Sequence, residues 1–392
     1  MSDRPGFLFV TCQIGAEAAL KSEVARRWPE FRFAYSRPGF VTFKLPHDHS
    51  LPADFDLEAV FARAHAFSLG KVTAREKGTG PICRNGPEGA SHKLDLSPFP
   101  YLAGVWKLWG NRPVKRLHVW ERDKEPPGEH GFEPSITQGA IDAARAIESR
   151  ESRVQSPESR GEGRGSDSRL TTLDSRLSRD MVLDCVLVEP NEWWVGFHLV
   201  HSVPSQWPGG MMPLELPPDA VSRAWLKMEE ALRWSQLPIS RGARCAEIGS
   251  APGGSSQALL ARGYNVIGID PAEMDPAVLG HPQFTHIRRR AVQVRRRDFR
   301  KVRWLMADMN VAPPYTLDVV ESIVTHPEVN VRGMLLTLKL LEWKLADELP
   351  AWLDRIRSWG YNRVWARQLQ HNRQEVCVAA LQKPFVRKVF RR

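Results

Sequence analysis

The spacing of apolar residues marks out the first elements of this chain of 392 residues. Near the N-terminus, apolar runs predict strands at 7–12, 31–36 and 40–45, and a helical pattern predicts a helix at 16–28. Pro38 and Gly39 separate the second and third strands and favour a turn there. A helix at 56–67 and a strand at 68–74 complete what we interpret as a small α/β domain over residues 1–75.

A second α/β unit is predicted over residues 76–201. Its patterns indicate a strand at 114–123, a helix at 136–150 and two joined strands within 181–202. Residues 148–180 repeat Ser, Arg, Glu and Gly and hold almost nothing to bury, which predicts a disordered insertion. An arginine-rich arm that folds on RNA is the alternative for this insertion.

From residue 216 onward, predicted strands and helices alternate regularly. Helices are expected at 218–234, from Ser255, at 316–326 and at 345–360, and strands at 243–249, 265–270, 303–309 and 333–341. This alternation is typical of an α/β fold with a parallel sheet covered by helices on both faces. Two further strands, at 362–370 and 375–382, flank a polar turn and predict an antiparallel hairpin at the sheet edge.

The bulk composition narrows the class of protein. Hydrophobic residues make up 42% of the chain, as in ordinary globular proteins, and no apolar run is long enough to span a bilayer. Because the first residues lack the apolar core of a signal peptide, we expect a soluble, cytoplasmic protein without a membrane partner. The five cysteines are scattered without paired spacing, which predicts reduced thiols and neither a disulfide framework nor a metal site.

Positive charge is concentrated in two segments. The formal net charge is +10, and residues 288–303 are mostly Arg or Lys, with Asp298 as the single acidic residue among them. Residues 384–392 form a second basic segment, which we interpret as a tail. Such density favours a polyanion, so we predict a nucleic acid as partner. The alternative for residues 288–303 is a solvated, basic strand pair without a ligand.

A glycine-rich turn follows the strand expected at 243–249. Ligands of open α/β sheets bind at the carboxyl ends of strands, where such turns let the backbone approach closely. This turn departs from two phosphate-binding patterns, because Ala251 replaces a glycine of the dinucleotide fingerprint and Ser255 stands where a phosphate-binding loop has Lys. Its candidate cofactor-binding residues are Gly249, Ala251, Pro252, Gly253, Gly254 and Ser255.

Two carboxylates beside the turn indicate which cofactor it holds. Glu247 repels phosphate but can hold an ammonium group. Asp270 ends the next strand, at a spacing at which an acid reaches the ribose diol in nucleotide-binding folds. Together they predict an adenosine cofactor without phosphate, and S-adenosyl-L-methionine, with its ammonium and sulfonium groups, meets that description. An ordinary strand-to-helix turn without a ligand is the alternative.

Several short motifs follow one another between residues 203 and 383. They are SRAWLKMEEAL, AEIGSAPGG, WLMADM, LLTLKL and RQLQHNRQEVCV. In content and order they resemble the FtsJ-type ribose 2'-O-methyltransferases, most closely the RlmM-like group that acts on a cytidine of 23S ribosomal RNA. The resemblance implies a Rossmann-type methyltransferase domain at 202–383, S-adenosyl-L-methionine as cofactor, and large-subunit RNA or its precursor as partner. It also implies that residues 76–201 form a THUMP-like RNA-binding domain.

The family uses a Lys-Asp-Lys-Glu tetrad, which the motifs place at Lys227, Asp308, Lys339 and Glu375. A ribose 2'-hydroxyl is a poor nucleophile, so its proton must leave or its developing charge must be stabilised. We expect Lys339 to act as the base or the oxyanion stabiliser, and the other three residues to orient and tune it. Two lysines in one pocket lower each other's pKa, whereas carboxylates act in the opposite direction. Asp308 is also a candidate cofactor contact.

Taken singly, each residue of the tetrad also has an ordinary structural interpretation. Lys227 could be an exposed lysine on a helix, and Asp308 could cap the segment that follows it. Lys339 could be a strand lysine with charged partners, and Glu375 an ordinary carboxylate of the hairpin.

The sequence departs from the family at four positions. Glu247 replaces Asp, Ser255 replaces Trp, Leu341 replaces Pro, and Ala291 stands where an acid contacts the adenine edge. Ser255 and Ala291 motivate an alternative function, a non-catalytic RNA-binding or ribosome-assembly protein with a degenerate methyltransferase fold. A NAD-dependent dehydrogenase is disfavoured by Ala251.

Overall fold

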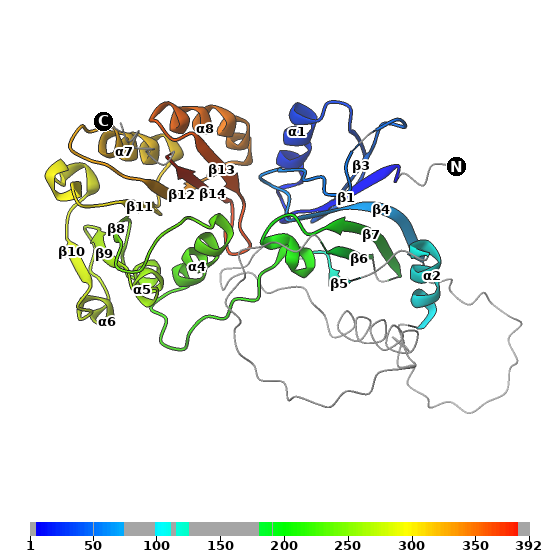
Figure 1. Ribbon diagram of the computed structural model, residues 1–392, viewed down its shortest axis with the longest axis horizontal. Helices are drawn as coiled ribbons and strands as arrows, with labels where there is room; N and C mark the ends of the chain where they lie inside the picture. Colours follow the sequence, from blue (N-terminus) through cyan, green and yellow to red (C-terminus); the bar gives the residue numbers. More distant parts are fainter. Residues whose placement is uncertain are drawn as a thin grey trace, which may run out of the picture.

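The computed structural model describes residues 5–49, 51–73, 99–110, 115–124, 180–189 and 191–382. These residues form two seven-stranded sheets, which lie side by side with their helices (Figure 1). The predicted helix at 136–150, the insertion at 148–180 except for its last residue, and the basic tail at 384–392 lie outside the described residues. None of the described helices combines the length and the apolarity that crossing a bilayer requires.

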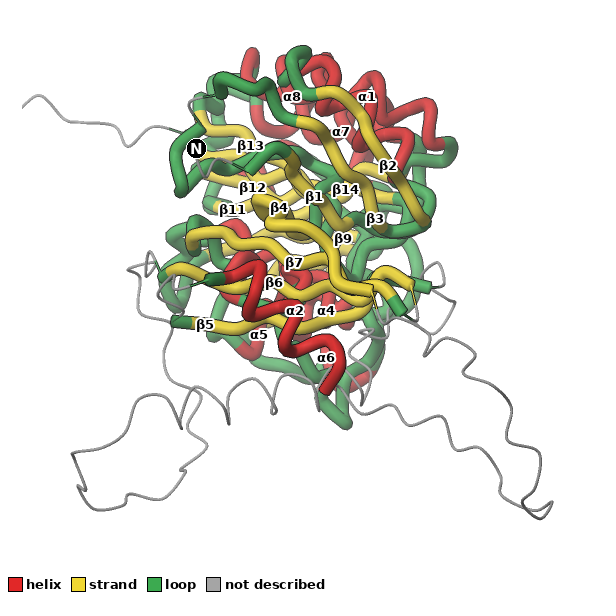
Figure 2. Tube along the Cα trace, turned by 90° about the vertical axis from the view of Figure 1, so that its right-hand side faces the viewer, coloured by secondary structure: helices red, strands yellow, loops and turns green. Residues whose placement is uncertain are grey.

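The first sheet has the strand order β2-β3-β1-β4-β7-β6-β5. Its strands are β1 (Phe7–Thr11), β2 (Arg32–Arg37), β3 (Phe40–Lys44), β4 (Ala64–Thr73), β5 (Arg116–Glu121), β6 (Met181–Glu189) and β7 (Glu192–Leu199). Neighbouring strands are antiparallel, except that β5 runs parallel to β6. Its helices are α1 (Glu17–Arg27) and α2 (Phe99–Trp109), and α2 lies across β4 and β7 (Figure 2).

Strands from both expected N-terminal domains belong to this one sheet. β4 pairs with β7 from Phe67 opposite Phe197 to Thr73 opposite Glu192. The hydrogen-bonded ladder is therefore continuous across the expected boundary at residue 75.

The helix expected at 56–67 is wrong. Residues 56–63 form an irregular loop with a turn at Val60 and Phe61, and the last residues of the expected helix already belong to β4. The apolar side chains of this segment are buried, as they would be in a helix. Its backbone amides, however, do not bond within a helix: those of Val60 and Phe61 donate to the carboxylate of Glu23, at 2.8 and 3.2 Å. Glu58 has a φ of 47°, which interrupts a right-handed helix. A carboxylate from α1 has thus replaced the hydrogen bonds of a helix.

The second sheet has the order β10-β9-β8-β11-β12-β14-β13. Its strands are β8 (Arg244–Ile248), β9 (Asn265–Ile269), β10 (Phe284–Ile287), β11 (Trp304–Ala307), β12 (Gly333–Lys339), β13 (Arg363–Arg367) and β14 (Glu375–Leu381). β8 to β12 are mutually parallel, and β13 and β14 form the predicted antiparallel edge hairpin. β10 was not expected from the sequence.

Helices cover both faces of the second sheet, as predicted (Figure 1). They are α4 (Ala224–Ser235), α5 (Gly254–Ala261), α6 (Pro276–Leu279), α7 (Pro313–Val324) and α8 (Leu349–Ser358). Met228 of α4 and Leu259 of α5 share one core cluster with strand residues. Leu317 of α7 and Ile356 of α8 belong to another, which continues into the core around α1. Burial on two faces explains why the central strands are almost wholly apolar.

The two sheets are joined by packing and by buried hydrogen bonds. The ring of Trp343 packs edge-on against Phe61, with centroids 6.3 Å apart. The side-chain amide of Gln13 donates to the backbone carbonyl of Asn372 at 2.9 Å. The backbone amide of Gln368 donates to the backbone carbonyl of Val60 at 2.8 Å. Both contacts reach the β13–β14 hairpin, so the N-terminal sheet helps to position that hairpin.

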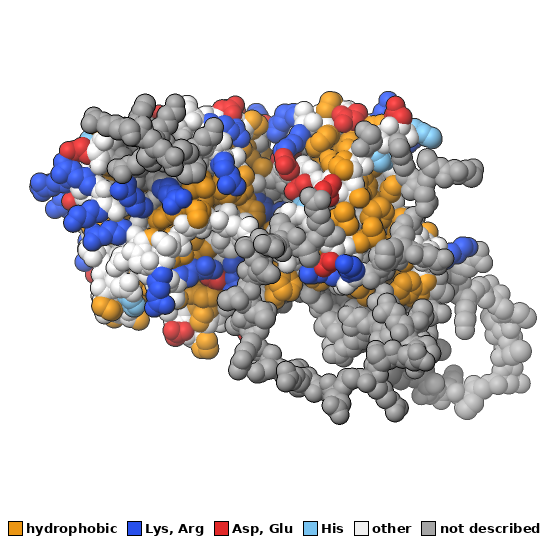
Figure 3. Space-filling view, in the orientation of Figure 1, with side chains coloured by type: hydrophobic (Ala, Val, Ile, Leu, Met, Phe, Trp, Pro, Cys, Tyr) orange, Lys and Arg blue, Asp and Glu red, His pale blue; other side chains and the backbone are white. Residues whose placement is uncertain are grey.

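The arginine-rich segment is not a strand pair. Between β10 and β11 it forms two short 3-10 turns, η3 (Ala291–Gln293) and η4 (Arg296–Phe299). Val294, Phe299 and Val302 are buried and anchor the segment, while most of its basic side chains are exposed. Figure 3 shows Lys and Arg side chains gathered at that end of the second sheet.

We predict that Gly249→Ala destabilises the fold more than Gly242→Ala. Both glycines have positive φ, 81° and 78°, which costs about 1–2 kcal/mol for a residue with a Cβ. At position 249 a Cβ would also lie 2.4 Å from the carbonyl oxygen of Asp308, whereas at position 242 it would meet nothing within 4 Å. We expect this clash to add roughly 1–3 kcal/mol in urea unfolding. Equal losses in the two variants would contradict the close approach of β8 to the end of β11.

Candidate active site

The glycine turn lies where expected, between β8 and α5. Gly253 has a φ of 125°, and α5 begins at Gly254. A Cβ on Gly254 would lie 2.2 Å from the hydroxyl of Ser222, so the start of α5 requires glycine. The amide of Ala251 donates to Asp270 at 3.2 Å, and the carbonyl of Pro252 accepts from the amide of Asp275 at 2.9 Å. The turn is thus fixed by close packing and by its neighbouring loop.

Asp270 is held by the loop that follows β9. One carboxylate oxygen accepts from Ala251, and the other accepts from the amide of Ala272 at 2.8 Å. Ala291, which replaces the expected acid, is buried at the start of η3, and Asp298 is exposed on η4.

Glu247 lies beneath the turn and is 1% exposed. The hydroxyl of Ser256 donates to its Oε2, while its Oε1 is buried without a hydrogen-bond partner among the described residues. Burial raises the pKa of this carboxyl to about 8; hydrogen bonds from Ser256 and Ser255 oppose the rise, and the charge of Asp308 adds to it. A buried acceptor without a donor is costly and suits a cationic group.

The predicted tetrad converges at the carboxyl ends of β11 and β12. Lys227 projects from α4, Asp308 follows β11, Lys339 ends β12 and Glu375 begins β14. Lys339 and Glu375 are directly opposite each other in the β12–β14 ladder. Glu375 contacts the ammonium groups of both lysines. Asp308 lies 3.0 Å from Lys339 Nζ and 4.0 Å from Lys227 Nζ.

The charges of the tetrad compensate one another. Burial opposes ionisation of Glu375, but Lys227 and Lys339 outweigh it and hold its pKa below the usual value. Burial likewise disfavours the charged form of Lys339, yet Asp308 and Glu375 outweigh it and raise its pKa. Lys339 is therefore an ammonium ion in this arrangement, because the attraction of the carboxylates prevails over burial.

Glu230 supports the site, and the motifs did not identify it. Its carboxylate accepts from the backbone amides of Gln370 and His371, at 2.7 and 2.9 Å, and so fixes the loop that leads into Glu375. Burial raises the pKa of Glu230 to about 7, against the effect of these bonds. Glu230 follows Lys227 by three residues and lies on the same side of α4. This helical spacing is the signal in the sequence that could have identified it.

His371 is a second unforeseen neighbour of the tetrad. Burial lowers its pKa to about 4, and the positive charges of Arg223 and Lys227 lower it further. Both of its ring nitrogens are buried without a hydrogen-bond partner among the described residues. Nearby, a cavity of about 20 Å³ is lined by Lys227, Ser255 and Asp308, among others. Two residues of the tetrad, Lys227 and Asp308, thus border a small space whose other walls are mostly apolar.

Residues 220–349 match the family model of the FtsJ-like methyltransferases, which confirms the resemblance for this part of the chain. A protein of Laribacter hongkongensis named Ribosomal RNA large subunit methyltransferase M is 32% identical, over 44% of this chain and 51% of its own length. A protein of the same name from Halorhodospira halophila is 33% identical, with the same coverage. The chain spans about half the length of the curated relatives it matches.

Among solved structures, TrmN from Thermus thermophilus covers 96% of this chain and 99% of its own, at 14% identity and a TM-score of 0.34.

We predict that Glu247→Gln flattens the pH dependence of stability. The carboxyl has a pKa of about 8 when folded against 4.5 for the ordinary group, so between these values the folded chain binds more protons than the unfolded chain. Stability should therefore fall as pH rises through this window, by up to about 1.4 kcal/mol per pH unit.

Urea unfolding across that window measures the effect. Glu273→Gln, at an exposed carboxylate, is the control and should leave the slope unchanged. An unaltered slope in Glu247→Gln would show that the buried carboxyl is not protonated.

Proposed function

We propose that this chain is an S-adenosyl-L-methionine-dependent methyltransferase that modifies a ribose 2'-hydroxyl of RNA. The observation that carries this proposal is the convergence of Lys227, Asp308, Lys339 and Glu375, which lie far apart in the sequence. The FtsJ-like match over residues 220–349 supports the same reaction class. Bringing two lysines and two carboxylates together in a largely enclosed place has a desolvation cost, which favours a catalytic role over a non-catalytic one.

The residues beneath the turn fit the cofactor. S-adenosyl-L-methionine supplies a methyl group on a positively charged sulfur. Oε1 of Glu247 is a buried acceptor that an ammonium group would satisfy, and a nearby cation would return the carboxyl to its charged form. The residues that we propose hold the cofactor are Glu247, Gly249, Ala251, Pro252, Gly253, Gly254, Ser255, Asp270 and Asp308.

The electrostatics of the tetrad favour one of the two roles considered for Lys339. With its pKa raised, the side chain carries a proton and can stabilise the negative charge that develops on the 2'-oxygen. It could act as a base only after losing that proton. Asp308 and Glu375 hold the ammonium group in place, and Lys227 balances the charge of Glu375. We therefore propose Lys339 as the oxyanion stabiliser.

We propose large-subunit ribosomal RNA, at a cytidine of the 23S molecule, as the substrate. The names of the relatives support the class of RNA, and the resemblance supports the cytidine. The exposed arginines between β10 and β11 are suited to phosphate contacts. As part of the same proposal, residues 76–201 supply a THUMP-like RNA-binding region to the sheet that they share with residues 1–75. Residues 202–383 are the Rossmann-type domain, and the protein acts in the cytoplasm.

We predict that Lys339→Ala lowers methyl transfer at least about 100-fold, because an oxyanion loses its charged donor. Lys344→Ala, at an exposed position beyond β12, should transfer at the normal rate. Transfer of labelled methyl groups to undermethylated ribosomal RNA measures both rates.

Lys339→Arg tests the assigned role. Arginine keeps the charge but cannot serve as a base, so it should retain more activity than Ala. Activity in Lys339→Arg that is no higher than in Lys339→Ala would argue against stabilisation by charge.

We predict that Arg289→Ala combined with Arg297→Ala weakens RNA binding and makes its salt dependence less steep. Each lost phosphate contact should reduce the slope of log affinity against log salt by about 0.7–0.9. The control combines Arg241→Ala with Lys344→Ala, at exposed positions outside this segment and outside the first sheet. If both double variants bind alike over a salt series, the segment between β10 and β11 does not contact RNA.

A further inference from the structure

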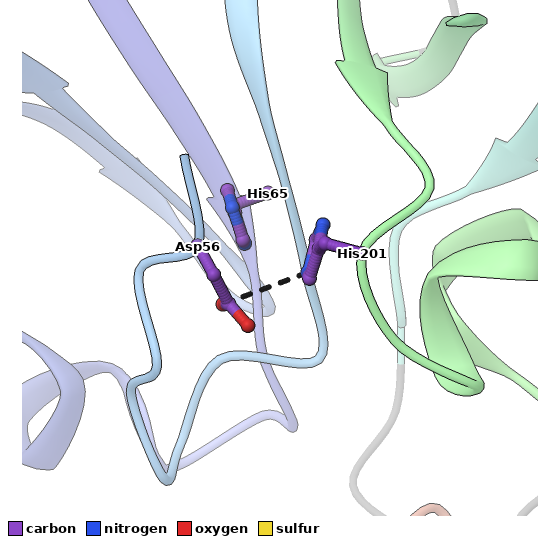
Figure 4. A group of neighbouring side chains, drawn as sticks. All are labelled: Asp56, His65 and His201. Atoms are coloured by element: carbon purple, nitrogen blue, oxygen red, sulfur yellow. Dashed lines mark ion pairs between the residues drawn. The ribbon is translucent and has the colours of Figure 1, made fainter. Parts of the chain in front are cut away.

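Three side chains from the N-terminal sheet and its connections converge away from the tetrad. Asp56 lies in the loop before β4, His65 in β4, and His201 just after β7 (Figure 4). His201 Nε2 is 3.5 Å from Asp56 Oδ1, and one possible ligand atom from each of the three residues lies within 4.8 Å of the others. Imidazole and carboxylate are common ligands of zinc and related divalent ions.

The outer nitrogens of both imidazoles contact backbone carbonyls. His201 Nδ1 is 3.0 Å from the carbonyl oxygen of Leu199. His65 Nε2 is 3.1 Å from the carbonyl oxygen of Phe55, to which it can donate, and the amide of Leu57 donates toward the same nitrogen at 3.4 Å. These two contacts require opposite tautomers, and we assign the shorter one, with the proton on Nε2. A ring N–H that donates to a carbonyl leaves a lone pair on the other nitrogen, the arrangement usual for metal-bound histidine.

His65 is buried and His201 is half-buried, so the three side chains meet largely away from bulk water. Arg367 is a nearby positive charge that reduces the affinity for a cation, so we expect moderate rather than very tight binding.

A neighbouring cluster of similar composition provides a contrast. His118, Asp184 and His198 also lie close together and are buried. There, His198 directs Nδ1 to Asp184 at 2.5 Å and Nε2 to the carbonyl of Ser205 at 2.9 Å. Burial opposes the charged imidazole, but Asp184 prevails and raises the pKa of His198. Both ring nitrogens of His198 are thus engaged as donors, and this cluster is an ion pair.

We propose that Asp56, His65 and His201 bind a divalent transition-metal ion, with zinc as the best match. Ligands about 2.0–2.1 Å from a tetrahedral zinc ion are roughly 3.3 Å apart, so the observed 3.5 Å between His201 and Asp56 already fits one edge. A ligand atom of His65 lies within 4.8 Å of both, and the ion would draw it closer. The three residues lie on the wall of a cavity of about 1290 Å³ between the two sheets, which leaves room for a water as fourth ligand.

The ion would connect the loop before β4 to the segment that leads from β7 into the second half of the chain. This site departs from the expectation of no metal, which rested on cysteine spacing alone. It is also independent of the proposed methyl transfer, because metal binding is measured directly.

The test is metal content and Co²⁺ spectroscopy on the full-length chain. After chelation and dialysis against Zn²⁺, we expect one equivalent of zinc per chain by elemental analysis. Co²⁺ in its place should give the visible absorption of a four-coordinate ion. Absence of both stoichiometric zinc and this absorption would overturn the proposal.

Conservative variants locate the ion. Asp56→Asn keeps an oxygen for the amide of Glu58, which bonds to Asp56 Oδ1 at 2.8 Å, and should bind zinc far more weakly. We expect this loss to exceed the roughly 10- to 100-fold effect of removing an outer hydrogen-bond partner. His201→Gln should behave alike, whereas His201→Cys supplies a new ligand and should retain the ion.

His198→Gln, in the neighbouring cluster, is the control and should keep full metal content. If His198→Gln loses the ion while Asp56→Asn and His201→Gln retain it, the assignment to Asp56, His65 and His201 is wrong. Circular dichroism of each variant establishes that a loss of metal does not reflect unfolding.

Discussion

The arrangement of the second half of the chain depends on the ion pairs that Glu375 makes with Lys227 and Lys339. Glu375 is buried and both lysines are half-buried, so removing one partner would leave a poorly solvated charge without compensation. The ladder between β12 and β14 sets Lys339 opposite Glu375, and α4 supplies the second cation. The parallel strands then bring Asp308 to the same edge of the sheet. A charged, ordered and partly enclosed group of side chains results.

The N-terminal sheet contributes to this arrangement through the loop between β13 and β14. Gln13 bonds to the carbonyl of Asn372, whose own side chain donates to the carbonyl of Glu375 at 3.4 Å. Glu230 holds the same loop from the other side. The loop between β13 and β14 is therefore fixed from two sides. One is α4, which carries Lys227, and the other is the N-terminal sheet, to which we assign part of the RNA binding. A shift of one half against the other would disturb Glu375.

Sequence reasoning succeeded where local pattern and motif order carry the information. The alternation after residue 216 predicted the second sheet, its covered faces and its hairpin, and the motifs named the four residues that converge. It failed where a residue far away in the sequence determines the local structure. Glu23 replaces the hydrogen bonds of the helix expected at 56–67, and pairing of β4 with β7 crosses the expected boundary at residue 75. Asp56, His65 and His201 share no spacing that a sequence pattern could reveal. The ionised state of Lys339 depends on distances to carboxylates, which no motif supplies.

The most direct measurement of the central claim uses ribosomal RNA in which a single nucleotide is altered. The methylated nucleotide is first mapped in undermethylated large-subunit RNA after reaction with labelled S-adenosyl-L-methionine. An otherwise identical RNA fragment with 2'-deoxycytidine at that position is then compared with the ribose form. Our account predicts methyl transfer to the ribose form alone and unchanged binding of both fragments. Equal transfer to the deoxy form would place the methyl group on a base and contradict the assignment of the tetrad to a ribose hydroxyl.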